Sequence, residues 1–360
     1  VLTADGVGEW ATTTVAIGKG NNLEIKKEIH FPHSLGLLYS AFTYYTGFKV
    51  NSGEYKLMGL APYGAPIYED KIKNNLIDIK EDGSFYLDQS YFNYATGLTM
   101  TNNKFANLFG QKVRDAKYEK LTQFHMDIAA SIQKVTEDIM IRLARSLKKE
   151  FNLNNLCLAG GVALNCVANS NVVKDQYPNM WILPNPGDAG SSLGCAAYVG
   201  GKHIDFMENG AFLGYDIKGK YPVKPVVKEL LKGNLVGVAN GRAEYGPRAL
   251  GNRSLLADPR GKDIKDKMNE IKNRQKFRPF APSVLEEHAH EIFDMPTKKS
   301  QFMQYVAPCK YPEKYPAICH VDNTSRVQTV SKEDNPGYYK LIKEFYKETN
   351  CPMVLNTSLN

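Results

Sequence analysis

Two strand–turn–helix units follow one another in the middle of the chain. The first has the short apolar run Leu156–Ala159, the glycine pair Gly160 and Gly161, and then a segment that starts as a helix. The second has the run Met180–Leu183, a loop that contains glycine, and a helix of small residues from Gly190. Strands that alternate with helices across glycine turns predict an α/β fold, and helix N-termini beside such turns are suited to binding anions.

The elements before these units are also readable from the sequence. Residues 1–30 alternate β-branched and polar side chains around a GKGNN turn, which predicts a β-hairpin or meander. Apolar spacing predicts helices over Ser34–Tyr45 and Lys120–Glu150. Residues 67–117 are rich in tyrosine and asparagine and are expected to form a looser insertion.

A domain boundary is predicted near residues 216–225, where the sequence is charged and contains two prolines. We therefore expect one domain over residues 1–220 and a second over residues 221–360. The first holds 22 basic and 22 acidic side chains, whereas the second holds 23 basic and 16 acidic ones. The basic excess of the second domain is expected to attract anions such as phosphates.

The segment from Gly241 to Ser254 reads GRAEYGPRALGNRS and carries three arginines. Arginine presents a planar fork of donors that matches two oxygens of a phosphate or carboxylate. Gly246 and Gly251 allow the backbone to approach a ligand. The alternative is a solvated helix face, but such a face carries Glu and Lys at i,i+4 spacing and has no use for a Gly-Pro pair. We therefore predict an anion site in this segment.

Further candidates for anion binding are spread over the second domain. Lys272 and Arg278 precede a Pro-Phe-Ala-Pro block, Arg326 follows a Thr-Ser turn, and Ser358 lies just after an expected terminal strand. Several cations together with a hydroxyl pair suit triphosphate binding, although the chain has no P-loop motif.

Charged residues of the first domain lie in glycine-containing loops at strand ends, which is where catalytic groups are often held. Asp5, Glu54 with Lys56, and Asp188 are of this kind. Asp5 and Asp188 can share one divalent metal ion. The alternative is that each aspartate only caps a turn or a helix, above all Asp188, which comes just before an expected helix.

The cysteines and the apolar runs bear on the location of the protein. Six cysteines are scattered with no C-x-x-C pair, which argues for reduced thiols in a cytoplasmic protein and against a disulfide framework or a zinc site. No apolar run approaches the ~18–20 residues of a membrane span, and no signal peptide is seen. The chain begins at Val1 inside an expected strand, so we expect a fragment of a longer protein.

Eight separated blocks give the chain a resemblance to a known family. They read DGVGEWATT, HSLGLLYSAFTYYTGF, NSGEYKLMGLAPYG, LAGGVALNCVAN, NPGDAGSSLG, GRAEYGPRALGNRSLLADPR, FRPFAPSV and LNTSLN. In order and spacing these blocks resemble the nodulation and antibiotic O-carbamoyltransferases over nearly the whole chain. The resemblance implies two α/β domains: a partial actin/sugar-kinase-like (ribonuclease H-like) domain, followed by a YrdC-like domain that forms carbamoyl adenylate.

The resemblance also implies a reaction. Carbamoyl phosphate and ATP give carbamoyl adenylate in the second domain, and the carbamoyl group then passes to an acceptor hydroxyl in the first domain beside a divalent metal. That metal is iron in relatives, and Mg²⁺ accompanies ATP. Two histidines that complete the metal site in relatives lie upstream of Asp5 and are missing here. Nucleic acid and membranes are not expected partners, and a homodimer is left open.

Roles for individual residues follow from the same resemblance. The contacts to carbamoyl phosphate and ATP are expected to be Arg248, Lys272, Arg278, Arg326 and Ser358. In the first domain the expected metal ligands are Asp5 and Asp188, the expected catalytic residues are Glu54 and Lys56, and the expected nucleotide contacts are Gly160, Gly161 and Asn165.

Two other functions compete with carbamoyl transfer. A small-molecule kinase with an actin-like fold would use Asp5 and the glycine pair, but it would leave the arginines after residue 240 without a role. A tRNA-modifying or RNA-binding protein would use the basic half of the chain on a phosphate backbone, and its RNA affinity would depend strongly on salt. The charge of the second domain is not accompanied by a recognisable RNA-binding signature.

Overall fold

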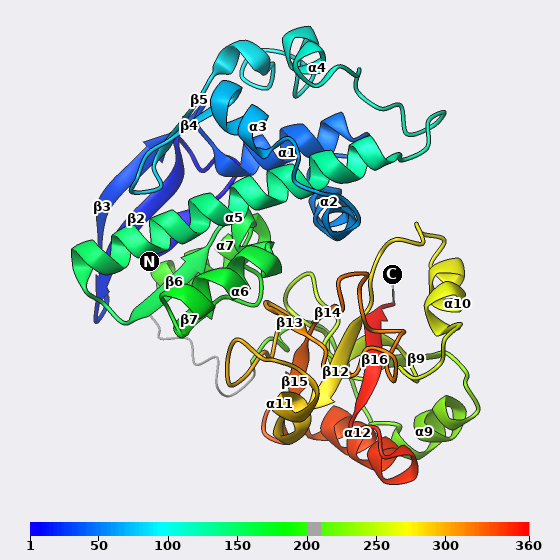
Figure 1. The fold of residues 1–360 in the computed structure, drawn as a ribbon. Helices are drawn as coiled ribbons and strands as arrows, with labels where there is room; N and C mark the ends of the chain where they lie inside the picture. Colours follow the sequence, from blue (N-terminus) through cyan, green and yellow to red (C-terminus); the bar gives the residue numbers. More distant parts are fainter. Residues whose placement is uncertain (201–209, 360) are drawn as a thin grey trace. The chain divides into compact units, whose positions relative to one another are not determined.

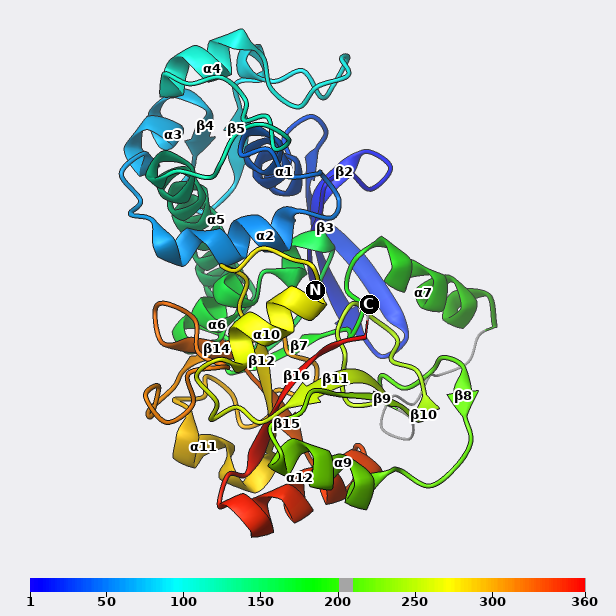
Figure 2. The same ribbon diagram turned by 90° about the vertical axis from the view of Figure 1, so that its right-hand side faces the viewer.

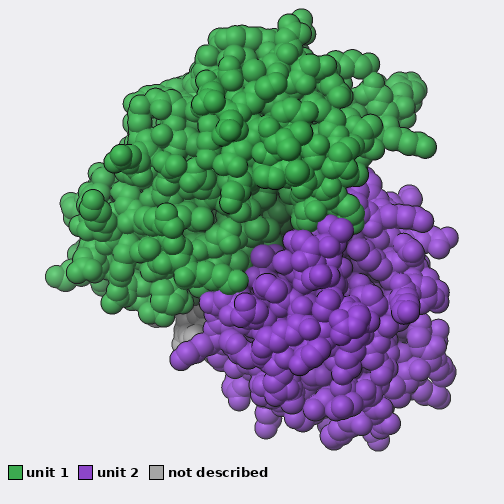
Figure 3. Space-filling view, viewed as in Figure 1, with its two compact units in different colours: residues 1–187 green, residues 188–360 purple. Residues whose placement is uncertain are grey.

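The computed structural model describes residues 1–200 and 210–359. The chain divides into two compact units, residues 1–187 and 188–360, which Figure 3 draws in different colours. The division falls earlier than the boundary expected near residues 216–225. One reason is that β8 (Asp216–Ile217) pairs with β10 (Gly241–Arg242), which places the expected linker inside the second unit. No helix in the described ranges is long and apolar enough to cross a membrane.

Unit 1 is built on a mixed sheet in the order β3-β2-β1-β6-β7 (Figure 1). Its strands are β1 (Leu2–Ala4), β2 (Ala11–Lys19), β3 (Asn22–His30), β6 (Asn155–Ala159) and β7 (Asn179–Ile182). β1, β2 and β3 are antiparallel neighbours, which confirms the predicted meander. β1, β6 and β7 are parallel, as expected when helices connect the strands.

The long helix α5 (Gln123–Phe151) organises unit 1 and confirms the helix predicted over Lys120–Glu150. It begins with a capping box between Thr122 and His125, and it ends at Asn152, whose left-handed backbone terminates the helix. α5 packs against several other helical segments of the unit. These are α1 (Leu35–Tyr45), α2 (Glu54–Leu60), α3 (Glu69–Asn75), α6 (Cys166–Asp175) and the 3₁₀ turn η1 (Ala61–Tyr63).

The insertion over residues 67–117 is more ordered than expected. It contains α3, the hairpin of β4 (Ile77–Ile79) and β5 (Phe85–Leu87), the 3₁₀ turn η2 (Gln89–Tyr91) and α4 (Asn103–Phe109). Phe105 and Phe109 of α4 are buried against the rings of Phe42 and Tyr45 on α1. The expectation of a loose segment was wrong, because a few buried aromatic side chains order this segment although most of its residues are polar.

Unit 2 contains a second five-stranded sheet in the order β15-β12-β16-β11-β9 (Figure 2). Its strands are β9 (Val236–Ala239), β11 (Arg253–Ala257), β12 (Ala281–Leu285), β15 (Gln328–Val330) and β16 (Met353–Ser358). β12 and β15 are parallel, and the other neighbours are antiparallel. A separate pair joins β13 (Val306–Pro308) to β14 (Thr324–Arg326).

The helices of unit 2 include α9 (Val223–Leu231) and α12 (Pro336–Thr349), which pack on one another and on the sheet. α12 starts at Asn335, whose side chain accepts the N–H of Tyr338, and proline occupies its first position. The other helical segments are α7 (Asp188–Gly200), α10 (Ile264–Ile271), η4 (Glu286–His288) and α11 (Ala289–Ile292).

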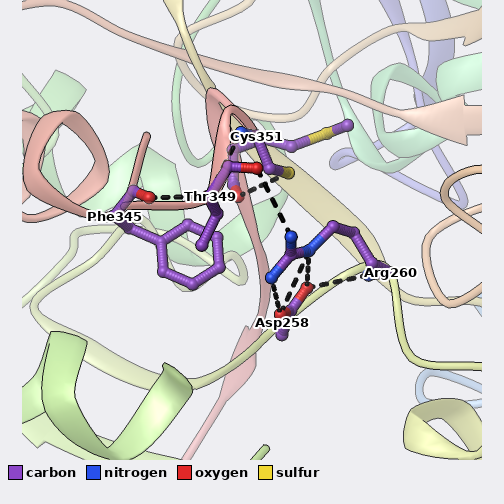
Figure 4. Close-up of polar contacts among 6 residues, drawn as sticks. Asp258, Arg260, Phe345, Thr349 and Cys351 are labelled. Carbon is purple, nitrogen blue, oxygen red and sulfur yellow. Dashed lines mark hydrogen bonds and ion pairs between the residues drawn. The ribbon is translucent and has the colours of Figure 1, made fainter. Parts of the chain in front are cut away.

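Arg260 lies just after β11 and makes contacts within the protein. Its guanidinium forms a two-pronged ion pair with Asp258, with Nη2–Oδ2 at 2.6 Å, and donates to the carbonyl of Thr349 at 3.4 Å (Figure 4). Thr349 also accepts the N–H of Cys351 at 3.1 Å. Arg260 therefore links the segment after β11 to the C-terminus of α12, where a cation also interacts favourably with the helix dipole.

Candidate functional site

The candidate site of unit 1 starts at the turn that follows β1. Asp5 carries its carboxylate there, and Oδ1 accepts the N–H of Gly6 at 2.7 Å. The backbone carbonyl of Asp5 accepts the Ser34 hydroxyl at 2.8 Å and the Gly36 N–H at 3.3 Å. A Cβ on Gly36 would lie 2.6 Å from that carbonyl, so glycine is required for this close approach. The first turn of α1 is thereby held against Asp5.

The glycine pair Gly160–Gly161 lies against the same turn. Gly160 has a φ of 91°, and a Cβ there would lie 2.2 Å from the carbonyl oxygen of Ala4. A Cβ on Gly161 would lie 2.9 Å from Oδ1 of Asp5. Any other residue type would therefore push the end of β6 away from the end of β1. The structure brings together three predicted site residues that are far apart in the sequence: Asp5, Gly160 and Gly161.

Asn165 has structural contacts in this structure. It is buried and caps α6, because its Oδ1 accepts the N–H of Ala168 at 3.1 Å. Its side-chain amide also exchanges two hydrogen bonds, of 3.0 and 3.1 Å, with the amide of Gln133 on α5. These contacts fix the start of α6, and contact of Asn165 with a nucleotide stays a prediction.

Glu54 and Lys56 lie at the start of α2. The Glu54 carboxylate accepts the N–H of Asn51 at 3.0 Å, the N–H of Gly53 at 3.1 Å and the Ser40 hydroxyl at 2.8 Å. It therefore closes its own loop and ties it to α1. The Lys56 ammonium lies 6.0 Å from the centre of the Phe48 ring. The pairing of these two residues over one ligand stays a prediction.

The described residues do not fit a resident iron ion. Asp188 is exposed at the first position of α7 and is the first residue of the second unit. Within residues 1–200 and 210–359, no group of three or more His, Cys, Asp or Glu side chains gathers in a way that could hold a metal. Tight iron or zinc sites use about three or more protein ligands, commonly with imidazole or thiolate among them. The metal role of Asp5 and Asp188 stays a prediction.

The candidate site of unit 2 centres on Lys272, which caps the C-terminus of α10. Its ammonium donates to the backbone carbonyl of Ser358 at 2.5 Å and lies 3.4 Å from the Ser358 hydroxyl. Partial burial, and then the positive charges of Arg274 and Arg278, lower the pKa of Lys272 to about 8. The structure thus brings Ser358 close to Lys272, which is in turn near Arg278 from the same predicted segment.

Arg274 belongs to this cluster and was not among the predicted contacts. Its Nε donates to the Asn269 side chain at 2.7 Å, its Nη2 donates to the Pro279 carbonyl at 3.3 Å, and its guanidinium lies 4.1 Å from the centre of the Phe280 ring. These contacts hold the guanidinium in one place, from which its charge acts on Lys272. The signal that could have found it was its position two residues after Lys272 in the basic segment.

The arginine-rich segment folds into a loop that is held together by its own glutamate. Oε1 of Glu244 accepts three backbone N–H groups, from Leu250 at 2.7 Å, Asn252 at 2.9 Å and Arg253 at 3.2 Å. The Arg253 guanidinium donates to four backbone carbonyls, those of Tyr215, Asn240, Gly241 and Asn252. Arg253 is therefore a brace for the loop, whereas Arg242 is exposed and Arg248 is partly buried.

Gly251 has a packing role in this structure. Its φ is 115°, and a Cβ there would lie 2.3 Å from the ring of Tyr338 on α12. The missing side chain therefore makes room for an aromatic ring of the core, and the approach of a ligand to this backbone stays a prediction. Arg326 ends β14, where it pairs with Val306 of β13, and is partly buried. Its contact with a ligand stays a prediction.

Comparison with known proteins identifies the family. Residues 1–197 match the model of the carbamoyltransferase N-terminus, and residues 227–360 match that of the carbamoyltransferase C-terminus. An uncharacterized protein of Synechocystis sp. is 48% identical over the whole chain, which covers 67% of that protein. The nodulation proteins NolNO of Sinorhizobium fredii and NolO of Bradyrhizobium diazoefficiens are each 35% identical over the whole chain, which covers 55% and 69% of them. The chain thus spans only part of each relative, and it belongs to the carbamoyltransferase family of enzymes.

Proposed function

We propose that the chain acts as an ATP-dependent O-carbamoyltransferase. In the proposed reaction, unit 2 converts carbamoyl phosphate, water and ATP to carbamoyl adenylate, phosphate and pyrophosphate: water releases phosphate from carbamoyl phosphate, and the carbamate then displaces pyrophosphate from ATP. Unit 1 then passes the carbamoyl group to a hydroxyl of a sugar or another small-molecule acceptor. On this proposal unit 1 is part of an actin-like domain, and unit 2 contains a YrdC-like domain. The mixed sheet of unit 1, with three antiparallel and two further parallel strands, is compatible with that assignment.

The observation that carries the proposal is the cationic cluster at the end of β16. Lys272 is held against Ser358 although partial burial, and then the charges of Arg274 and Arg278, disfavour its ammonium form. Bringing like charges together costs free energy, and an anionic ligand offsets that cost when it binds among them. Phosphate oxygens of ATP or carbamoyl phosphate match both the ammonium and the guanidinium donors. Charge that develops on a leaving pyrophosphate would be stabilised by the same groups.

Unit 1 supplies the second half of the proposal. The carboxylate of Asp5 lies beside Gly161, and the backbone carbonyl of Asp5 accepts the N–H of Gly36 in the first turn of α1. That arrangement suits a carboxylate that orients a phosphate or an acceptor hydroxyl. Carboxylate oxygens are ligands that Mg²⁺ prefers, so Mg²⁺ that enters with ATP fits Asp5 better than iron does. No step of the proposed reaction is derived through a bound metal.

Exchange of labelled pyrophosphate into ATP tests the first half-reaction. The 360-residue chain is expected to catalyse this exchange only when carbamoyl phosphate is present. Lys267 on α10 pairs with Asp263 at the surface, so Lys267→Met serves as a matched loss of a basic side chain and should leave the exchange intact. Exchange that is absent, or that does not depend on carbamoyl phosphate, would contradict the proposal. Phosphate transfer to a small molecule would then favour the kinase alternative, and salt-sensitive RNA binding would favour the RNA alternative.

A further inference from the structure

Two buried side-chain amides hold the backbone of the loop formed by residues 244–253, which carries Arg248 and is called the Arg248 loop below. Gln328 begins β15 and Asn356 lies within β16, and their exposed fractions are 4% and 1%. Nδ2 of Asn356 donates to the carbonyl of Ala249 at 2.9 Å, and Nε2 of Gln328 donates to the carbonyl of Leu250 at 3.1 Å. These carbonyls belong to the two residues that directly follow Arg248, so both amides act on the backbone beside it.

The two amides are also linked to one another, both directly and through the hydroxyl of Ser283. Ser283 on β12, which lies between β15 and β16, donates to Oε1 of Gln328 at 2.5 Å. Nδ2 of Asn356 lies 2.9 Å from the Ser283 hydroxyl and 3.1 Å from Oε1 of Gln328. Ser283 is fully buried. Because buried polar groups are costly to leave unpaired, this network strongly favours one arrangement of the three side chains.

The amides are connected in sequence to other proposed ligand contacts. Ser358 follows Asn356 by two residues on β16, so both side chains lie on the same face of that strand. Arg326 precedes Gln328 by two residues. β16, the strand that carries Ser358, therefore also supplies Asn356 as one anchor of the loop, while Gln328 anchors it from the start of β15. At the other side of the loop, Glu244 accepts the N–H groups of Leu250, Asn252 and Arg253.

We propose that Gln328 and Asn356 are positioning residues that set the place of Arg248 relative to Ser358. The inference rests on the proposed function, since Arg248 is taken to contact the phosphates. Side chains of the sheet donate to the carbonyls of residues 249 and 250, and Glu244 accepts the N–H groups of residues 250, 252 and 253. Loss of either amide leaves a buried carbonyl without its donor and allows the loop to shift. A displacement of about 1 Å at a transition-state contact costs about 100-fold in rate.

Gln328→Met tests the inference, because methionine has a similar size but cannot donate to Leu250. The expected result is that kcat/KM for pyrophosphate exchange falls about 100-fold. Amides of residues 244–253 should also exchange with deuterium faster. Thr349→Val is the control. It removes a hydroxyl at the C-terminus of α12, in the same unit, that bonds to the backbone of Phe345 and Cys351 (Figure 4). The control should change neither readout.

A double-mutant cycle separates positioning from general destabilisation. If Gln328 acts through Arg248, Gln328→Met should weaken ATP binding in the wild-type background and add nothing to Arg248→Ala. If Gln328→Met folds poorly, the pair Gln328→Met with Ser283→Ala also removes the buried hydroxyl that donates to Gln328, and it should restore stability without restoring pyrophosphate exchange.

Each outcome decides one claim. Additive effects on ATP affinity, or unchanged deuterium exchange in residues 244–253, would overturn the positioning role even in an active enzyme. Wild-type protein without exchange dependent on carbamoyl phosphate would overturn the proposed function. Deuterium exchange would still decide whether the amides anchor the loop.

Discussion

Lys272 is expected to make ATP binding depend on pH in a range where the phosphates of ATP no longer titrate. Its pKa is about 8 in the unliganded protein because the ammonium is partly buried and faces Arg274 and Arg278. A bound triphosphate favours the charged ammonium, so the pKa of Lys272 should rise towards its ordinary value of 10.5 in the complex. Binding therefore takes up a proton when the solution pH lies between about 8 and 10.5.

The size of the effect follows from the pKa. With a pKa of about 8, the charged fraction of Lys272 falls from about 0.9 at pH 7 to about 0.1 at pH 9. The affinity for ATP should therefore fall about tenfold between these pH values. Folding stability has the opposite sign. Between pH 8 and 10.5 the unfolded chain binds more protons at this lysine than the folded chain does, so this group contributes stability that rises with pH and is lost as pH falls through 8.

Calorimetric titration with ATP at pH 7, 8 and 9 and constant ionic strength measures this dependence. Lys272→Arg keeps a charge at all three pH values and should bind ATP with a nearly constant affinity. Lys272→Met should bind weakly at every pH. Lys267→Met is the control and should keep the tenfold dependence, since Lys267 pairs with Asp263 at the surface. The same pH dependence in wild type and Lys272→Arg would refute the reasoning.

Three further outcomes are expected. Arg248→Ala and Arg278→Ala should each reduce pyrophosphate exchange by an amount equivalent to about 2–4 kcal/mol, with an unchanged circular dichroism spectrum; rates near wild type in either variant would remove that residue from the site. Gly251→Ala should lower the melting temperature far more than Gly233→Ala, because both have positive φ but only Gly251 faces an aromatic ring at 2.3 Å, whereas Gly233 faces open space. Arg260→Ala should lower the free energy of unfolding by about 1 kcal/mol or more without changing pyrophosphate exchange, and a loss of exchange would assign Arg260 to the site.

Much of the local structure could be predicted from the sequence because it depends on local patterns. The meander of residues 1–30, the helix of residues 123–151 and the two strands of the central units were all predicted from periodicity and glycine turns. The segment 67–117 was not, since its order depends on Phe105 and Phe109 packing against a helix more than 50 residues away. Burial of a few aromatic rings leaves no periodic pattern in a short, polar segment.

The site was predictable in its residue types more than in its roles. Arginine and lysine in the second half indicated an anion site, and Lys272, Arg278 and Ser358 do lie together. Arg253 donates to backbone carbonyls and Arg260 pairs with Asp258. The sequence could not distinguish these two arginines from arginines that face a ligand. An arginine that donates to carbonyls and one that binds phosphate use the same donors.

The sequence by itself determined that the chain alternates strands and helices, that its positive charge gathers in the last 140 residues, and that it resembles the carbamoyltransferases. These properties depend on composition, on periodicity and on motifs that are contiguous along the chain. Only in the folded structure do Glu244, Gln328 and Asn356 come together to hold the Arg248 loop, and only there do burial and nearby like charges lower the pKa of Lys272. Such roles depend on the distances in space between residues that are far apart in the chain. The strength of a hydrogen bond or a Coulomb interaction depends on that distance, whatever the number of residues between the two partners.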